Sequence, residues 1–195
     1  MTPKRFIILI LSVIVFGLSY LLISQSYPIA FVNWQPIIFS SFKKDVLSAG
    51  SYYQKILETY DKNQAVVMNS KEVKQEIERA VLDKLIEDKL IWRELEKRLE
   101  NNDLKKMIND KIEEAIKGKD IKKEVEALYG ISLNEFKERF LKPQARREIF
   151  ESRLQLENNL SVGGLDNWLK KIKKQAKVVI FLPGFEWNGE GIIIK

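Results

Sequence analysis

Apolar residues occur in two patterns along this chain: one unbroken block near the start and a periodic pattern in the rest. Residues 6–23 contain no charged residue, and Lys4 and Arg5 stand directly before them. A helix over this block would be about 27 Å long at 1.5 Å per residue, close to the hydrocarbon thickness of a bilayer. The residues of this predicted anchor include Phe6, Ile10, Val13, Phe16 and Leu21.

The basic residues before the block predict its orientation. Because Lys4 and Arg5 favour the cytoplasmic side, we expect the N-terminus in the cytoplasm and the body of a single-pass protein in the periplasm or at the cell surface. A cleaved signal peptide is the alternative, although Ser24-Gln25-Ser26 is a poor cleavage site and the block is long for that class. Both interpretations export the body. A buried core helix is disfavoured because no other segment is comparably apolar.

Beyond the block, apolar residues recur every three or four positions, which predicts amphipathic helices. The longest follows Asn69, which forms a capping-box pattern with Glu72, and its apolar stripe is wide enough to pack on several helices. Ser132 and Glu135 form a second capping box, and Gly118 suits a left-handed helix end. The predicted helices cover residues 40–60, 69–99, 104–116, 120–130, 133–140, 143–154 and 168–177.

Two short segments instead resemble strands. Residues 29–33 can form a strand or an extended arm, and residues 178–182 are rich in β-branched side chains. We expect the strand near Val32 to pair with the run near Val179. The predicted fold is therefore mainly α, with a transmembrane helix, a multi-helix domain and a small β element that joins the domain's start and end. The predicted domains are an anchor or signal peptide (1–24), the helical domain (25–182) and a C-terminal tail or hairpin (183–195).

Composition excludes several kinds of chemistry. The chain has no histidine and no cysteine, so Ser-His-Asp and Cys-His catalysis, His-ligated metal sites and disulfides are impossible. No phosphate-binding glycine loop or nucleophile elbow occurs. The net charge of +6 is mild and its acids and bases are interspersed, which does not suggest nucleic acid. We therefore expect no catalytic residue, no metal and no cofactor.

Five segments, taken in order, resemble the N-terminal domain of the SurA/PrsA-type periplasmic chaperones. The similarity consists of apolar and charged patterns, so the order and spacing of the segments are what make it specific. It covers most of the predicted helical domain and implies a SurA N-like chaperone fold. The segments are V-N-W-Q-P-I at 32–37, A-V-L-D-K-L-I-E-D-K-L at 80–90, Y-G-I-S-L-N-E-F at 129–136, the helix at 143–154 and the helix and strand at 168–180.

The chain departs from that family in three places. Many members insert a parvulin-type prolyl isomerase domain before the C-terminal helix, but here only residues 155–164 are available, and histidines are absent. Trp34 stands where the family often has glycine, at a tight turn. The tail after Pro183 has no counterpart. The resemblance therefore implies the chaperone domain without the isomerase.

The resemblance implies ATP-independent binding of unfolded or newly exported polypeptides. Such binding needs exposed apolar and aromatic surface. The candidate client-binding side chains, each of which also fits a core position, are Trp34, Phe39, Tyr52, Tyr53, Trp92, Phe140 and Trp168. A basic run can contact anionic lipid or form a solvated helix face; it contains Lys170, Lys171, Lys173 and Lys174.

Three other functional classes are compatible with parts of this pattern. An envelope scaffold or adaptor would use the same domain to bind one dedicated protein partner. A degenerate isomerase is disfavoured by the missing histidines and the missing insertion. A membrane-surface protein would lay the basic helix on anionic lipid, with steep salt dependence.

Overall fold

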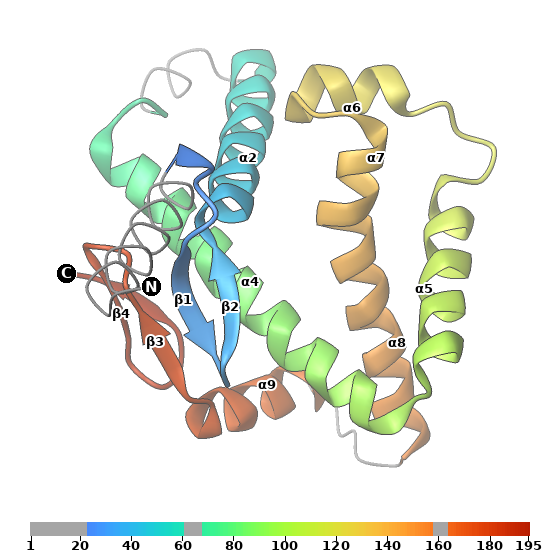
Figure 1. Cartoon of the computed structure of the whole chain (residues 1–195). Coiled ribbons are helices and arrows are strands. Elements are labelled where there is room, and N and C mark those ends of the chain that lie inside the picture. The colour runs from blue at the N-terminus through green and yellow to red at the C-terminus, as the bar shows by residue number, and fades with distance from the viewer. Residues whose placement is uncertain (1–22, 61–67, 158–163) are drawn as a thin grey trace, which may run out of the picture.

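Helices make up most of the described chain, as predicted, and two small β elements accompany them (Figure 1). The computed structural model describes residues 23–60, 68–157 and 164–195. The elements, in order, are β1 (Pro28–Val32), β2 (Gln35–Ile38), α2 (Phe39–Tyr60), α4 (Lys71–Arg98), α5 (Asn101–Ile116), α6 (Lys122–Tyr129), α7 (Leu133–Phe136), the π-helix η1 (Lys137–Leu141), α8 (Lys142–Leu156), α9 (Gly164–Gln175), β3 (Val178–Ile180), β4 (Phe185–Trp187) and β5 (Ile192–Ile194).

The predicted membrane anchor lies outside this description. Phe6, Ile10, Val13, Phe16 and Leu21 all precede the first described residue, Ile23. Among the described helices, none combines the length and the apolar character that a membrane span requires.

A three-stranded antiparallel sheet joins the start and the end of the domain, which confirms the predicted pairing. The central strand β1 pairs with β2 on one side and with β3 on the other. Val32 lies opposite Val178, and Phe31 lies opposite Val179. Because side chains alternate along a strand, Ala30 and Val32 are buried, whereas Phe31 points to the other face.

The turn between β1 and β2 is tight even though it lacks glycine. Its two central residues, Asn33 and Trp34, have φ angles of 47° and 71°, the positive values that two-residue hairpin turns require. The Asn33 side chain accepts a hydrogen bond from the Lys177 backbone N–H, and the Asn33 N–H donates to the Lys177 carbonyl. This pair of bonds stabilises a turn that is unfavourable for a residue as bulky as Trp34.

Helix ends follow the local rules with a few shifts from the prediction. Ser132 and Glu135 form the expected capping box, and Gly118 has a φ of 71°. The cap of α4 is Ser70, not Asn69: the Ser70 hydroxyl accepts a hydrogen bond from the Val73 N–H at 3.3 Å. Helix α5 begins at Asn101 without a side-chain cap.

Two clusters of buried residues form the core, and α4 contributes to both. The α4 residues up to Leu90 pack with the sheet, α2 and the β4–β5 hairpin, and those from Ile91 onward pack with α5, α8 and α9. The first cluster contains Ile91, Leu95, Leu104, Ile108, Ile112, Ala145, Ile149, Phe150, Leu154, Leu165 and Leu169. The second contains Ile29, Ala30, Val32, Ile37, Phe42, Leu82, Ile86, Leu90, Phe185 and Ile192.

The C-terminal segment closes both clusters. Helix α9 buries Leu165 and Leu169 in the first cluster, and its later residue Ile172 packs against the second. Residues 183–195, predicted as a tail or hairpin, form the antiparallel β4–β5 hairpin, which buries Phe185 and Ile192. The hairpin is therefore packed onto the helical domain.

Leu154→Ala is expected to lower the free energy of unfolding by about 2–5 kcal/mol, the usual cost of this truncation in a well-packed core. Leu154 is 3% exposed, whereas Leu156 on the same helix is 78% exposed. Leu156→Ala is therefore the matched control, with an expected change within about 0.5 kcal/mol. Urea denaturation followed by circular dichroism measures both. Equal effects of the two substitutions would contradict the assigned packing of α8.

Candidate functional site

An apolar groove lies between two parts of the chain that are far apart in sequence. Helices α2 and α4 form one wall and the floor, and the segment from the end of α6 to the start of α8 forms the other wall (Figure 1). The groove has a volume of about 280 Å³. Asp88 and Pro143 line this groove and also line two neighbouring cavities, so the three hollows belong to one cleft.

Aromatic rings dominate one end of the groove. Tyr52 stacks on Tyr129 with ring centres 4.9 Å apart, and Tyr53 lies edge-on to Tyr52. Tyr129 also contacts Phe136 at 4.8 Å and Phe140 at 5.1 Å. We call these five side chains the aromatic cluster. Its members come from α2, α6, α7 and η1, so the cluster also ties the two walls together.

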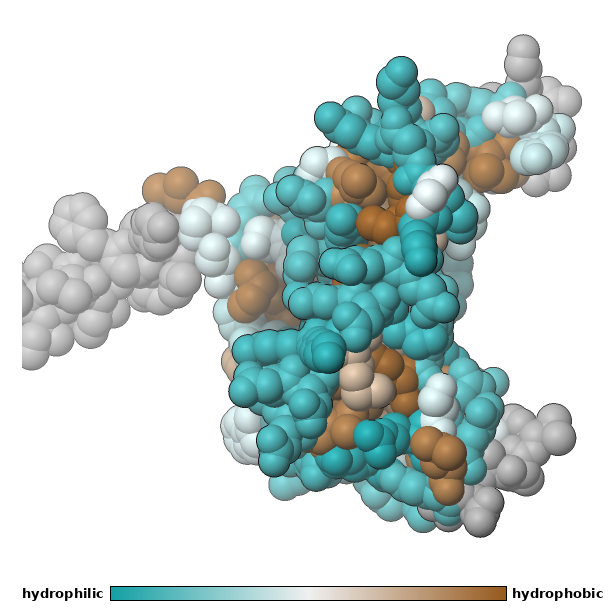
Figure 2. Space-filling view, turned by 90° about the vertical axis from the view of Figure 1, so that its right-hand side faces the viewer, coloured by the Kyte–Doolittle hydropathy of each residue, from teal (hydrophilic) through white to brown (hydrophobic). Residues whose placement is uncertain are grey.

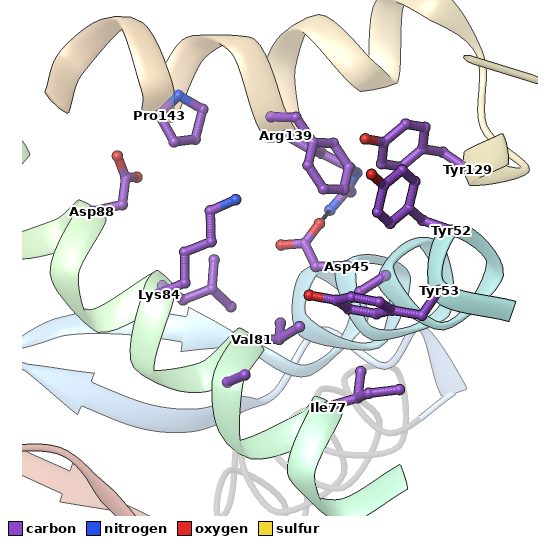
Figure 3. Close-up of a pocket in the computed structure, with 14 residues that line it drawn as sticks. Asp45, Tyr52, Tyr53, Ile77, Val81, Lys84, Asp88, Tyr129, Arg139 and Pro143 are labelled. Carbon is purple, nitrogen blue, oxygen red and sulfur yellow. Dashed lines mark hydrogen bonds and ion pairs between the residues drawn. The ribbon is translucent and has the colours of Figure 1, made fainter. Parts of the chain in front are cut away.

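The floor of the groove comes from α4. Ile77, Val81 and Leu85 line it at spacings of four residues, which places them on one face of the helix. Ala80 borders the same hollow and is exposed. Figure 3 shows Ile77 and Val81 facing the tyrosines of α2 across this space.

A π-helical turn presents Arg139 and Phe140 to the groove. Residues 133–156 run without interruption through α7, η1 and α8, and at η1 the Lys142 N–H donates to the Lys137 carbonyl, five residues back. Pro143 follows at once and, lacking an N–H, cannot donate to the carbonyl of Arg139. Pro143 does occupy the first turn of α8, as predicted, but the widened turn makes one helix of what the sequence suggested were two. Single π turns often mark functional sites.

Among the ion pairs that bridge the walls, two are largely buried. The Arg139 guanidinium donates to Asp45 at 2.7 Å and also to the Ser41 carbonyl at 3.2 Å, which connects η1 to α2. Arg146 donates to Asp88 at 2.7 Å, which connects α8 to α4. All four charged side chains are largely buried. These pairs set the separation of the walls.

Lys84 places a cation inside the groove. Figure 3 shows its side chain reaching from α4 toward the opposite wall. Its ammonium lies 5.2 Å from the centre of the Phe140 ring. Within the described part of the chain it makes no ion pair, so a carboxylate or carbonyl of a bound molecule can approach it.

Burial changes the acid–base behaviour of two groups here. Desolvation raises the pKa of Asp45 above 3.8, and the hydrogen bond and charge of Arg139 offset part of that rise. Desolvation is the main cause that raises the pKa of Tyr129, and the neighbouring Tyr52 and Tyr53 raise it further. The Tyr129 hydroxyl therefore stays protonated at neutral pH. The groove therefore presents phenol groups that can donate hydrogen bonds.

Arg139→Gln is expected to raise the pKa of Asp45 further, because it removes the hydrogen bond and the positive charge that now lower it. Since the folded-state pKa already exceeds 3.8, the folded chain takes up this proton first as the pH falls. Protonation of Asp45 thus stabilises the fold, and this contribution is lost as the pH rises through the folded-state pKa. NMR titration of the carboxyl carbon measures the shift. Arg93→Gln, a substitution at an exposed position on α4, is the control and should leave the pKa of Asp45 unchanged.

The structure separates the predicted client-binding residues into groups. Tyr52, Tyr53 and Phe140 lie together in the groove. Trp92 and Trp168 are partly buried against the first core cluster and belong to the packing.

The remaining two predicted aromatic residues lie away from the groove. Phe39 is partly buried against the second core cluster, where it stacks on Tyr27 at 4.9 Å. Trp34 is 84% exposed at the tip of the β1–β2 hairpin. The groove therefore uses only part of the predicted set.

The predicted lipid-binding lysines do not behave as one group. Lys170, Lys171 and Lys174 are exposed on α9, but Lys173 is buried. Lys173 pairs with Glu87 at 2.7 Å and with Asp83 at 3.2 Å. Burial opposes its charge, but these two carboxylates outweigh that effect and raise the pKa of Lys173. The inclusion of Lys173 was wrong because the helical period turns this position toward α4.

Several groove residues were not predicted from the sequence. Tyr129 and Phe136 belong to a segment that was noted only for its capping box and its resemblance, although Phe136 and Phe140 share a helix face at four-residue spacing. Asp45 and Arg139 are 94 residues apart, and no local signal connects them.

The groove contains what binding of an apolar chain segment requires: an aliphatic floor, aromatic walls and a few fixed charges. In the described ranges, no three acidic side chains cluster as a metal site would need. Comparison of the chain with known protein families, with characterised proteins and with solved structures finds no match. The groove and the sequence patterns therefore carry the functional interpretation.

Proposed function

We propose that this protein is a membrane-anchored, extracytoplasmic holdase that binds unfolded or newly exported polypeptides without ATP and without catalysis. The observation that carries this proposal is the open groove with its aromatic cluster, of which Tyr53 is the most exposed ring. An apolar hollow that the chain's own side chains leave unfilled is costly in water, and such surfaces typically bind other molecules.

The size of the groove favours a polypeptide segment over a small cofactor. A hollow of about 280 Å³ lies at or below the lower limit of about 300–1,000 Å³ for drug-sized ligands. It accommodates one or two apolar side chains of an extended client. The neighbouring cavities continue the cleft, so adjacent client residues have room on either side.

The polar groups around the groove suit a peptide backbone. The phenols of Tyr52 and Tyr129 can donate to client carbonyls, and the ammonium of Lys84 can do the same. Because aromatic contacts adapt to many side chains, binding would depend little on client sequence. The resemblance to SurA/PrsA-type chaperones supports the same function.

A dedicated adaptor is the second candidate, and the fixed charges favour it. Lys84, Asp45 and Arg139 hold defined positions, which would let one partner with complementary charges bind more tightly than others. The same groove would then hold one protein rather than many.

Aggregation suppression distinguishes these functions. Residues 25–195 contain both core clusters, and circular dichroism would establish that this segment is folded. Light scattering of two unrelated denatured proteins, diluted into buffer without ATP, is then followed with and without it. A holdase suppresses both at near-stoichiometric amounts. Failure with both, by a folded chain, would contradict the proposal and favour the adaptor.

A matched pair of variants tests the groove itself. Tyr53→Ala removes a groove ring, whereas Tyr60→Ala removes an exposed ring from the same helix outside the groove. Tyr53→Ala should weaken suppression by about threefold to tenfold, the value of one aromatic contact of about 1 kcal/mol. Tyr60→Ala should have no effect. Equal loss in both variants would mean that clients bind elsewhere.

A further inference from the structure

The outer face of the three-stranded sheet is apolar, and part of it is exposed. Its inner face carries Ala30, Val32 and Ile37 into the core, so the alternate residues point outward. Phe31 lies opposite both Pro36 and Val179 and therefore shares this outer face with them. Phe181 contacts Phe31 edge-on with ring centres 5.9 Å apart. Val179 and Phe181 are 51% and 57% exposed.

Trp34 adds an exposed ring at the end of this sheet, at an energetic cost. It lies at the hairpin tip with a positive φ, a conformation that costs an L-residue roughly 1–2 kcal/mol. Its indole packs on almost nothing, so stability does not explain the residue. Backbone strain that is not offset by side-chain packing is typical of functional positions.

The chain enters the domain beside this sheet. Exposed Ile23 ends the apolar block, and Pro28 begins β1 only five residues later, a reach of no more than about 17 Å. This connection is held against the body: the Ser40 N–H donates to the Gln25 carbonyl at 3.0 Å, and the Phe39 N–H donates to the Tyr27 carbonyl at 2.9 Å. A membrane-spanning block would therefore keep the sheet close to the bilayer.

We propose that the outer face of the sheet rests on the lipid surface next to the anchor, with Trp34 and Phe181 among the headgroups. This inference rests on the anchor of the proposed function, and it adds a second membrane contact. Indole rings favour the membrane interface, where the ring is apolar and its N–H stays hydrated. Exposed Lys177, bonded to Asn33 at the same turn, supplies a cation for anionic headgroups.

The hydrophilic surface on the α5 side of the domain supports this orientation. Figure 1 shows the sheet in front of α4, with α5 on the far right. Figure 2, which views the molecule from the α5 side, shows a predominantly hydrophilic surface where apolar side chains occur in separate places. That side suits water. Two membrane contacts would prevent the domain from rotating about its anchor and would fix the direction in which the groove opens.

Labelling of single cysteines tests the contact, because the natural chain has none to remove. The full chain carries either Val179→Cys or Ala115→Cys, the latter at an exposed site on α5, and each is given a nitroxide label. Both are reconstituted into vesicles of phosphatidylcholine with a minority of phosphatidylglycerol. We expect accessibility to a water-soluble nickel complex to be about threefold or more lower at position 179 than at 115. Pure phosphatidylcholine vesicles should reduce the difference.

Each other outcome overturns the inference. Equal accessibility at both sites, in chains that float with vesicles, would remove the sheet contact and leave the anchor intact. Protection that disappears when most vesicles carry a single chain would assign the face to a second copy. A chain that fails to float with the vesicles would overturn both the anchor and the sheet contact. Holdase activity is tested independently of the anchor, by aggregation suppression with residues 25–195. Trp34→Gly, which suits the positive φ and should fold, is expected to reduce protection at position 179.

Discussion

Ala80→Trp is expected to weaken the proposed client binding strongly while leaving the domain folded. Ala80 is exposed and borders the groove, so an indole there can occupy the hollow between α2 and α4 without displacing core side chains. Loss of groove access should lower affinity for an unfolded client at least about tenfold, equivalent to about 1.4 kcal/mol. Fluorescence anisotropy of a labelled, permanently unfolded polypeptide measures it.

Ala115→Trp supplies the matched control for this experiment. Ala115 is exposed on α5, outside the groove, and the same substitution there adds the same apolar ring to the surface. Its affinity should equal that of the unmodified chain. Retained binding by Ala80→Trp, with an unchanged unfolding transition, would show that the groove is not where clients bind.

Ending the chain at Asn159 is expected to abolish cooperative folding. The truncation removes α9, β3 and the β4–β5 hairpin, and with them four buried apolar side chains: Leu165, Leu169, Phe185 and Ile192. At about 1.5–3 kcal/mol for each buried side chain, the loss is about 6–12 kcal/mol. That is comparable with the whole stability of a typical domain, about 5–15 kcal/mol. The truncation also exposes the edge of β1 that β3 now covers.

Thermal unfolding followed by circular dichroism at two wavelengths measures this effect. The truncated chain should show no sharp transition, whereas the segment 25–195 should show one. Leu156→Ala within the segment 25–195 controls for the loss of an exposed side chain near the cut. A truncated chain that melts as cooperatively and at the same temperature would mean that α9 is not part of the core.

Local features were predictable because they depend on neighbours in the chain. The capping box at Ser132, the left-handed Gly118 and most helix ranges follow from hydrogen bonds within a few residues. The pairing of Val32 with Val178 was also predictable, since two isolated strand-like runs at the ends of a helical domain have few other partners. The misplaced cap at Asn69 shows the limit, because neighbouring polar residues satisfy the same rule equally well.

The groove could not be predicted from the sequence, because it depends on contacts between helices that are far apart in the chain. Helical spacing shows that Tyr52, Trp92 and Trp168 each lie on a partly apolar face, but not which faces meet a neighbour. The structure packs both tryptophans against the core and leaves Tyr52 in the groove, because α4 and α8 converge at one end and separate at the other. The same packing brings Asp45 to Arg139.

The mainly α architecture was thus encoded in short-range periodicity, and the strand pairing in the positions of two strand-like runs. The groove, the π-helical turn beside Pro143 and the burial of Lys173 arose only when the helices packed together. The physical reason is that hydrophobic burial is non-directional: it specifies that a face is covered, and the shapes of all its neighbours decide by what.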